Sequence, residues 1–187
     1  MSSPSADLYY GYDLGEMYHS DYESTAPGWW QATEEEGGEA DWEDELARRL
    51  GWVEEPFPDD YPREDPSIWR LNGGDLRAAL DVQRQVQGEY ERTSETYRLY
   101  SASRAQRAKL LASVPVELET YGYDEGDTVW ALRHKESVQS VSDWGSIELK
   151  PLIVSPRWAE DIARFVELLE LNVPDGPPAW HLNCSSG

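Results

Sequence analysis

The stretch LYYGYDL, residues 8–14, is rich in aromatic side chains and is followed at once by Gly15. Aromatic residues favour strands, and a glycine after such a run is typical of a turn. Alternate residues of a strand share a face, so Tyr10 and Tyr12 are expected on the same side. The pattern predicts a strand in a sheet with one buried face, where Gly11 lets a neighbouring strand approach closely.

The same stretch has the ingredients of a ligand-binding loop. Its tyrosine rings would stack on a base or a sugar, and Asp13 would accept a bond from a hydroxyl group. A phosphate loop is excluded, because the chain has neither the GxxxxGK[ST] pattern nor a basic side chain nearby. Since Tyr9 and Asp13 fall together on the second face of the predicted strand, we expect a structural role.

Other strands are expected in the last third of the chain. VELETYGY (116–123) and TVWALRHK (128–135) predict a hairpin closed by DEGD (124–127), and PAWHLNC (178–184) predicts a final strand. DEGD lacks the twelve-residue spacing of a calcium-binding EF-hand loop. A further strand is expected at one of two places, SVQSVS (137–142) or IELK (147–150).

Two short helices flank these strands. In DWEDELARRLGW (41–52), Asp41 can cap the first turn, acids follow it, and Gly51 can end the helix in a left-handed conformation. A second helix is expected to open at Ser155 and Pro156, a cap followed by a proline of the first turn. Its apolar face is Trp158, Ile162, Phe165, Val166 and Leu169.

A long helical segment is expected between them. No proline occurs from Asp75 to Ala112, and apolar residues recur at helical intervals, which predicts either one long helix or a pair. Gly88 weakens the middle by roughly 1 kcal/mol relative to alanine, and TSET (93–96) is a second candidate break.

The predicted fold class is therefore α+β: a small antiparallel sheet packed by helices, with an acidic irregular segment and a long helical insertion. We expect a single domain over residues 1–187. Within it, 16–40 and 54–73 are predicted acidic or proline-rich loops, 74–113 the helical insertion and 114–184 the strand–helix–strand part of the core.

Charge is the strongest feature of the composition. The 187 residues include 37 acids and 16 bases, a net charge of −21, and the balance is −16 over 1–66, +3 over 67–113 and −8 over 114–187. Such a chain repels nucleic acid and anionic membranes and attracts basic protein surfaces. The simpler interpretation is that this high negative charge only keeps the protein soluble.

No catalytic, cofactor or metal site can be assigned from motifs. The three histidines lack short metal-binding spacings, HSDYE (19–23) fits a solvated loop better than a metal site, and no GxSxG occurs. The lone thiol, Cys184, lies three residues from His181 on a predicted strand, so their side chains should point to opposite faces. An enzyme would need a scattered site, with Asp13, His134 and the tyrosines as candidate parts.

Arginines recur along the predicted helical insertion. They would bind RNA, pair with the acidic N-terminal third of the chain, or pair with an acidic neighbour in an oligomer. They are Arg77, Arg84, Arg92, Arg98, Arg104 and Arg107.

The order of several segments resembles a family of small proteins of actinobacteriophages and their hosts. In that family a Gly-Tyr-Asp-Leu-Gly strand, a helix, a strand pair, a second helix and a Pro-x-Trp strand follow one another. The resemblance covers most of 7–55 and 114–184, leaves 56–113 as an insertion, and implies a phage or prophage origin but no activity. The segments are YYGYDLG (9–15), DWEDELARRLGW (41–52), the 116–135 hairpin, RWAEDIARFVELLEL (157–171) and PPAWHLNCSSG (177–187).

These features favour a non-enzymatic protein that binds a partner protein with a basic surface, contacts neither nucleic acid nor membrane, and works in the cytoplasm of an infected or lysogenic host. No cofactor is expected. The alternatives are a virion or assembly protein and an enzyme with a scattered site. The residues predicted to bind the partner are Trp29, Trp30, Glu34, Glu35, Glu36, Asp59 and Asp60.

Overall fold

The computed structural model describes residues 4–15, 26–35, 40–71, 73–122, 129–142 and 148–186. Its contacts divide the chain into two compact units. Met1–Arg49 with Ala112–Gly187 form the sheet unit, and Leu50–Leu111 form the helical unit. The predicted α+β class is confirmed, and the single domain stays a prediction.

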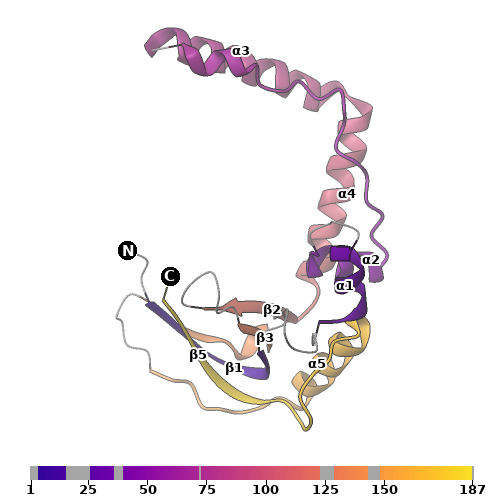
Figure 1. Ribbon diagram of the computed structural model, residues 1–187, viewed down its shortest axis with the longest axis vertical. Coiled ribbons are helices and arrows are strands. Elements are labelled where there is room, and N and C mark those ends of the chain that lie inside the picture. The colour runs from indigo at the N-terminus through magenta and orange to yellow at the C-terminus, as the bar shows by residue number, and fades with distance from the viewer. Residues whose placement is uncertain are drawn as a thin grey trace. The chain divides into compact units, whose positions relative to one another are not determined.

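A long first strand organises the antiparallel sheet (Figure 1). β1 pairs with β5 along one edge and with β3 and then β4 along the other, and β2 lies beyond β3. The five predicted strand regions are confirmed, with the third-strand alternative decided in favour of 139–142, since 148–150 is not a strand. The strands are β1 (Pro4–Gly15), β2 (Val116–Tyr121), β3 (Val129–His134), β4 (Gln139–Ser142) and β5 (Ala179–Ser186).

The strand opposite β1 is interrupted between β3 and β4 by a short 3-10 turn, η2 (Lys135–Ser137). The N–H of Tyr10 donates to Ser137 Oγ at 2.9 Å, which satisfies a donor that the interruption would otherwise leave unpaired. Close approach at Gly11 is confirmed, because a Cβ there would lie 1.8 Å from the carbonyl oxygen of Leu132.

In the described part of the sheet unit, the helices are α1 (Gly28–Glu35), α2 (Trp42–Arg49) and α5 (Pro156–Leu169). The predicted start and end of α2 are confirmed, with Asp41 Oδ1 accepting the N–H of Glu43 at 2.8 Å and Gly51 at φ +93°. α5 buries Ile162, Phe165 and Leu169, and the Trp158 ring stacks on His134 of β3 with centroids 5.1 Å apart.

Part of the loop predicted over 16–40 is instead helix α1. The Trp30 side chain is 5% exposed and meets Trp130 edge to face at 5.3 Å, and Trp29 Nε1 donates to the carbonyl of Leu169 at 2.8 Å. Packing of these indoles on the sheet unit therefore overrides the local preference of a glycine- and proline-rich sequence. Residues 16–25 and 36–39 lie outside the described residues.

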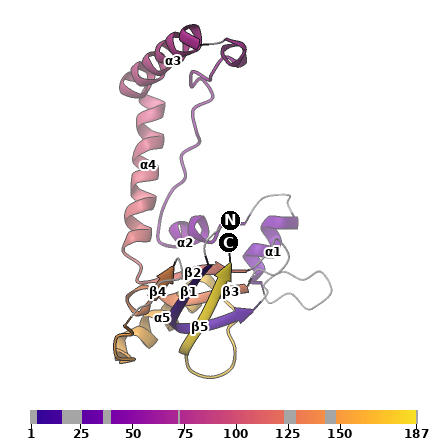
Figure 2. The same cartoon turned by 90° about the vertical axis from the view of Figure 1, so that its left-hand side faces the viewer.

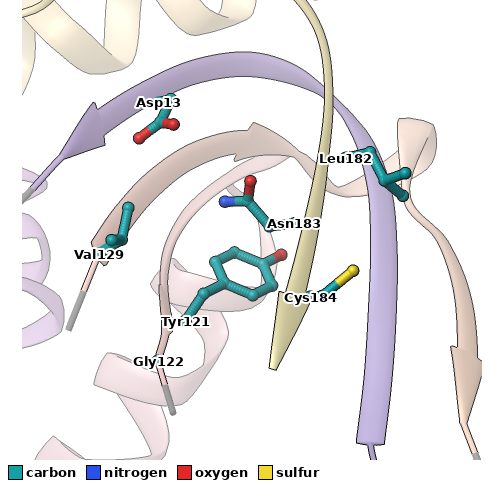
Figure 3. Close-up of a pocket in the computed structure, with 7 residues that line it drawn as sticks. All are labelled: Asp13, Tyr121, Gly122, Val129, Leu182, Asn183 and Cys184. Carbon is teal, nitrogen blue, oxygen red and sulfur yellow. The ribbon is translucent and has the colours of Figure 1, made fainter. Parts of the chain in front are cut away.

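The prediction of one buried face for β1 is wrong. Tyr9 is fully buried and Tyr10 is 8% exposed, although they point to opposite faces. Tyr10 packs on Trp158 and Trp180 beneath α5, whereas Tyr9 lies on the second face inside the curl of the sheet, against Tyr121. The curl, visible in Figure 3, therefore covers a face that a flat sheet would expose.

The helical unit contains η1 (Pro66–Arg70), α3 (Gly73–Thr93) and nearly all of α4 (Glu95–Ala112). The helix pair is confirmed, and its break falls at Ser94, within TSET, rather than at Gly88. Ser94 Oγ accepts the N–H of Tyr97, so the serine caps α4. Figure 2 shows α3 and α4 as two helices that meet at a bend. Most of the proline-rich stretch 54–73 is irregular, as predicted, apart from η1.

Aromatic contacts hold the irregular segment to the bend between α3 and α4. Tyr61 lies 5.7 Å from Tyr97 and 5.5 Å from Tyr90, between ring centroids. Trp52 Nε1 donates to Ser103 Oγ at 2.8 Å farther along α4. The cluster consists of Phe57, Tyr61, Tyr90, Tyr97 and Tyr100.

Candidate functional site: the polar face of the sheet

The face of the sheet opposite α5 carries most of its polar chemistry, and we call it the polar face. Strand alternation brings residues of β1, β2 and β3 together there, because Arg133 pairs in register with Glu117 on one side and Gly11 on the other. The polar face consists of Asp7, Tyr9, Asp13, Glu117, Glu119, Tyr121 and Arg133.

Arg133 is the centre of this face. Its guanidinium, in a residue 9% exposed, donates to Asp7 at 2.7 Å, Glu117 at 2.8 Å and Glu119 at 2.9 Å. Burial alone lowers the pKa of Arg133, but the bond to Glu117 and the nearby negative charge outweigh it and raise the net pKa. The guanidinium therefore stays charged, and three carboxylates surround one cation.

A row of rings runs beside this network. Tyr9 stacks on Tyr121 with centroids 6.0 Å apart and on His181 with centroids 5.5 Å apart. Asn183 Nδ2 donates to the Tyr9 hydroxyl at 3.1 Å, and the Tyr121 hydroxyl donates to Asp7 at 3.0 Å. Burial raises the pKa of both tyrosines, so both hydroxyls remain protonated near neutral pH.

Beside the rings lies a hollow of about 420 Å³ (Figure 3). Asp13, Val129, Tyr121 and Asn183 surround it, while the side chains of Leu182 and Cys184 point to the other side of β5. A second hollow, of about 470 Å³, is lined by Arg49, Arg164, Glu167 and Leu168. The described residues that line the first are Asp13, Tyr121, Gly122, Val129, Leu182, Asn183 and Cys184.

Asp13 and His134, two candidate parts of a scattered enzyme site, do not meet. Asp13 lies on the polar face, where its Oδ1 accepts the N–H of Gly15 at 2.9 Å. His134 points to the opposite face, is 1% exposed, and has Nε2 3.3 Å from Asp161. As expected, His181 and Cys184 also point to opposite faces of β5.

The predicted partner-binding residues fall in different surroundings. Burial leaves Trp30 little surface to offer, and Trp29 is half-buried. Asp59 and Asp60 lie in an exposed turn of the helical unit, where Asp60 accepts a bond from the Tyr90 hydroxyl. Partner binding by this set stays a prediction.

Several predicted residues have no described side chain. Glu34 and Glu35 lie in the last turn of α1, and only their backbone is described. Glu36, the HSDYE stretch (19–23) and DEGD (124–127) lie outside the described residues.

Three of the arginines singled out in the helical insertion pair with acids of their own helix. Arg84 lies 3.5 Å from Asp81, and Arg92 and Arg98 bond in the same way to the acids three residues before them. These exposed pairs contribute little to stability. Arg107 instead lies over the Trp52 ring, 5.9 Å from its centroid.

The Arg133 network is the site feature that sequence reasoning missed. Glu117 and Glu119 alternate with the apolar Val116 and Leu118, which places both carboxylates on one face of β2. The predicted hairpin would pair this face of β2 with Arg133 of β3, so the sequence did indicate this part of the network. The third carboxylate, from Asp7, lies 126 residues away in sequence and had no local signal.

The fold and site together define an α+β protein with a curled antiparallel sheet and a charged face. No family model, curated protein or solved structure matches the chain. The resemblance to actinobacteriophage proteins therefore stays a prediction. Among the residues described, no helix is long and apolar enough to cross a membrane, and no group of three or more His, Cys, Asp or Glu side chains is arranged to hold a metal ion.

Proposed function

We propose that the chain is an acidic interaction protein that binds a partner with a basic surface and alters the activity of that partner. The uneven charge of the two units carries this proposal. The sheet unit has 26 acidic and 7 basic residues, a net charge of −19, whereas the helical unit has 11 and 9, a net charge of −2. A field concentrated on one unit attracts basic surfaces and accelerates their association.

The polar face supports the same proposal. Its central network joins three carboxylates to one guanidinium, which leaves two negative charges without a cation inside the network. The Glu119 side chain is 42% exposed, so part of this charge is accessible to a partner. The strands hold these carboxylates in fixed positions, which favours a specific basic surface over a diffuse ion atmosphere.

A sharper form of the proposal is a nucleic-acid mimic that is encoded by a phage or mobile element. Its carboxylates would replace phosphates on a host protein. TEEEGGEADWEDE (33–45) and EEPFPDDYPRED (54–65) would supply the carboxylates of such a mimic. A mimic competes with nucleic acid for its target, whereas an ordinary acidic partner has no need to.

The test is affinity capture on the immobilised full-length chain from an actinobacterial lysate, at low and high salt, followed by purification of the retained protein. We expect a basic protein whose affinity falls steeply as salt rises. For the mimic, the chain must also displace DNA or RNA from that protein. Retention of no basic protein at any salt concentration would contradict the proposal.

A second candidate function is assembly with further copies of the chain through the helical unit. Several large apolar side chains of that unit are exposed, and its charge of −2 repels a second copy only weakly. Light scattering over a range of concentrations tests it, because assembly predicts a defined oligomer and a constant monomer mass contradicts it. These side chains are Trp69, Leu71, Val82, Val86 and Leu99.

A further inference from the structure

We propose that the hollow on the polar face receives one long cationic side chain, an arginine or lysine, of the basic partner. The inference rests on the proposed function and specifies where on the sheet unit the partner is recognised. Its ligand chemistry is a cationic head on an aliphatic stem, and the groups that surround the hollow match both parts.

The shape and lining of the hollow suit such a side chain. Its volume of about 420 Å³ lies within the range of sites that enclose small ligands. The Tyr121 ring and Val129 offer apolar surface to an aliphatic stem, and the Asp13 carboxylate lies across the hollow from the ring (Figure 3). Because Asn183 uses its amide nitrogen on Tyr9, its carbonyl oxygen is the acceptor that remains for a donor in the hollow.

Within the described part of the chain, Asp13 differs from the other carboxylates of the polar face because no lysine or arginine is paired with it. Asp7, Glu117 and Glu119 all bond to Arg133. Asp13 accepts the N–H of Gly15, and among the residues that the structure describes no lysine or arginine forms an ion pair with it. A cationic side chain of a partner that entered the hollow would bring a positive charge to the Asp13 carboxylate at its edge.

The same face already holds one guanidinium with the same types of group. Arg133 donates to carboxylates and lies with its Cζ 5.9 Å from the centroid of the Tyr121 ring. Carboxylate and aromatic ring together stabilise a cation more than either does alone in a desolvated site. The hollow therefore repeats, for an external side chain, the chemistry that holds the internal one.

Capped arginine, capped lysine and capped citrulline, which has the shape of arginine but no charge, are suitable probes for NMR titration of the full-length protein. We expect saturable shifts of the amide signals of Gly122, Val129 and Asn183 with the two cations and none with citrulline. Asp13→Asn keeps an oxygen for the Gly15 N–H and should weaken capped-arginine binding at least 5-fold, by the loss of a charge-assisted bond. Asp175→Asn, at an exposed position of the same unit, is the control with an equal change of charge and should bind as the natural chain does.

A second variant, Val129→Phe, fills the hollow without changing the charge and should also abolish the shifts. Equal binding of citrulline and arginine, or equal affinities of the Asp13→Asn and Asp175→Asn variants, would overturn the inference. The proposed function fails separately. If the natural chain and Asp13→Asn retain the same basic protein equally well, the proposed function is supported, but the hollow is not the binding site. If capped arginine binds but no basic protein is retained, the hollow binds a cation and the proposed function is contradicted.

Discussion

In the sheet unit, charged and aromatic residues are buried together, whereas those of the helical unit, apart from the buried Trp52, remain near the surface. Tyr9 is fully buried and Arg133 is 9% exposed, and each has several defined partners. The 21-residue helix α3 has no buried residue, and its end is held by contacts among partly exposed tyrosines. A buried polar network is costly when one member is lost, while exposed contacts can be replaced by water.

This difference predicts that equal substitutions have unequal effects in the two units. The sheet unit should be intolerant at positions where backbone or charge is enclosed. The helical unit should tolerate change along most of its helices. Three predictions test the contrast, beginning with the backbone.

Gly11→Ala should have the largest effect. The added Cβ would lie 1.8 Å from the carbonyl oxygen of Leu132, a backbone atom that cannot move without breaking the pairing of β1 and β3. We expect a loss of about 4 kcal/mol or more in the free energy of unfolding of the sheet unit. Urea denaturation followed by tryptophan fluorescence measures it.

Gly88→Ala is the matched control in the helical unit. Gly88 lies inside α3, and a Cβ there meets no atom within 4 Å. Alanine should therefore stabilise the helix by roughly 0.5–1 kcal/mol. Equal destabilisation by the two substitutions would show that the close approach of the Leu132 carbonyl to Gly11 is not the cause of the lost stability.

Sequence patterns predicted the elements that depend on local signals. The cap and stop of α2, at Asp41 and Gly51, are local, and so is the alternation that defines β2 and β3. Helix α1 was missed because its stability comes from Trp30 packing on Trp130, a contact across 100 residues of sequence. Local composition around Pro27 favours a loop, and only the tertiary contact reverses that preference.

The candidate site depends even more on contacts between residues that are distant in the sequence. Asp13 was singled out from its motif, and the structure places it beside a hollow. The curl of the sheet, which covers Tyr9 and creates that hollow, follows from the pairing of β1 with three other strands. Such pairings are set by the whole sheet, so a single strand carries no signal for them.

Arg133→Met should have the second largest effect. It leaves Asp7, Glu117 and Glu119 close together without their cation, and we expect a loss of about 3 kcal/mol in the free energy of unfolding at pH 7. Urea denaturation at pH 7, with the natural chain as the reference, measures this loss.

Arg157→Met is the matched control for charge removal in the sheet unit. Arg157 lies on α5 with its side chain 80% exposed, 3.5 Å from Asp161. Its loss should cost about 0.5 kcal/mol or less. Urea denaturation of both variants at pH 7 separates the cases, and equal losses in the two variants would show that enclosure of the Arg133 network does not matter.

The smallest effect is expected at Tyr61 in the helical unit. Its hydroxyl donates to Glu91 Oε1 at 2.9 Å, and this bond, more than burial, raises the pKa of Tyr61 from 10.0 to about 12. Because the folded pKa exceeds the unfolded one, the bond stabilises the protein fully below pH 10, and the stabilisation is lost as pH rises from 10 to about 12. Glu91→Gln should lower the pKa of Tyr61 towards 10.0, with a stability change of less than about 1 kcal/mol, since the site is exposed.

Ultraviolet absorbance at alkaline pH measures this ionisation, and subtraction of a Tyr61→Phe titration isolates Tyr61 from the other ten of the 11 tyrosines. Glu89→Gln is the control, because Glu89 bonds to Arg92 on the outside of the same helix. An unchanged Tyr61 titration in Glu91→Gln would mean that the aromatic cluster, rather than the carboxylate, sets its pKa. Ring packing would then hold the irregular segment to the bend. The two units would in that case be alike in depending on aromatic packing, although their net charges differ.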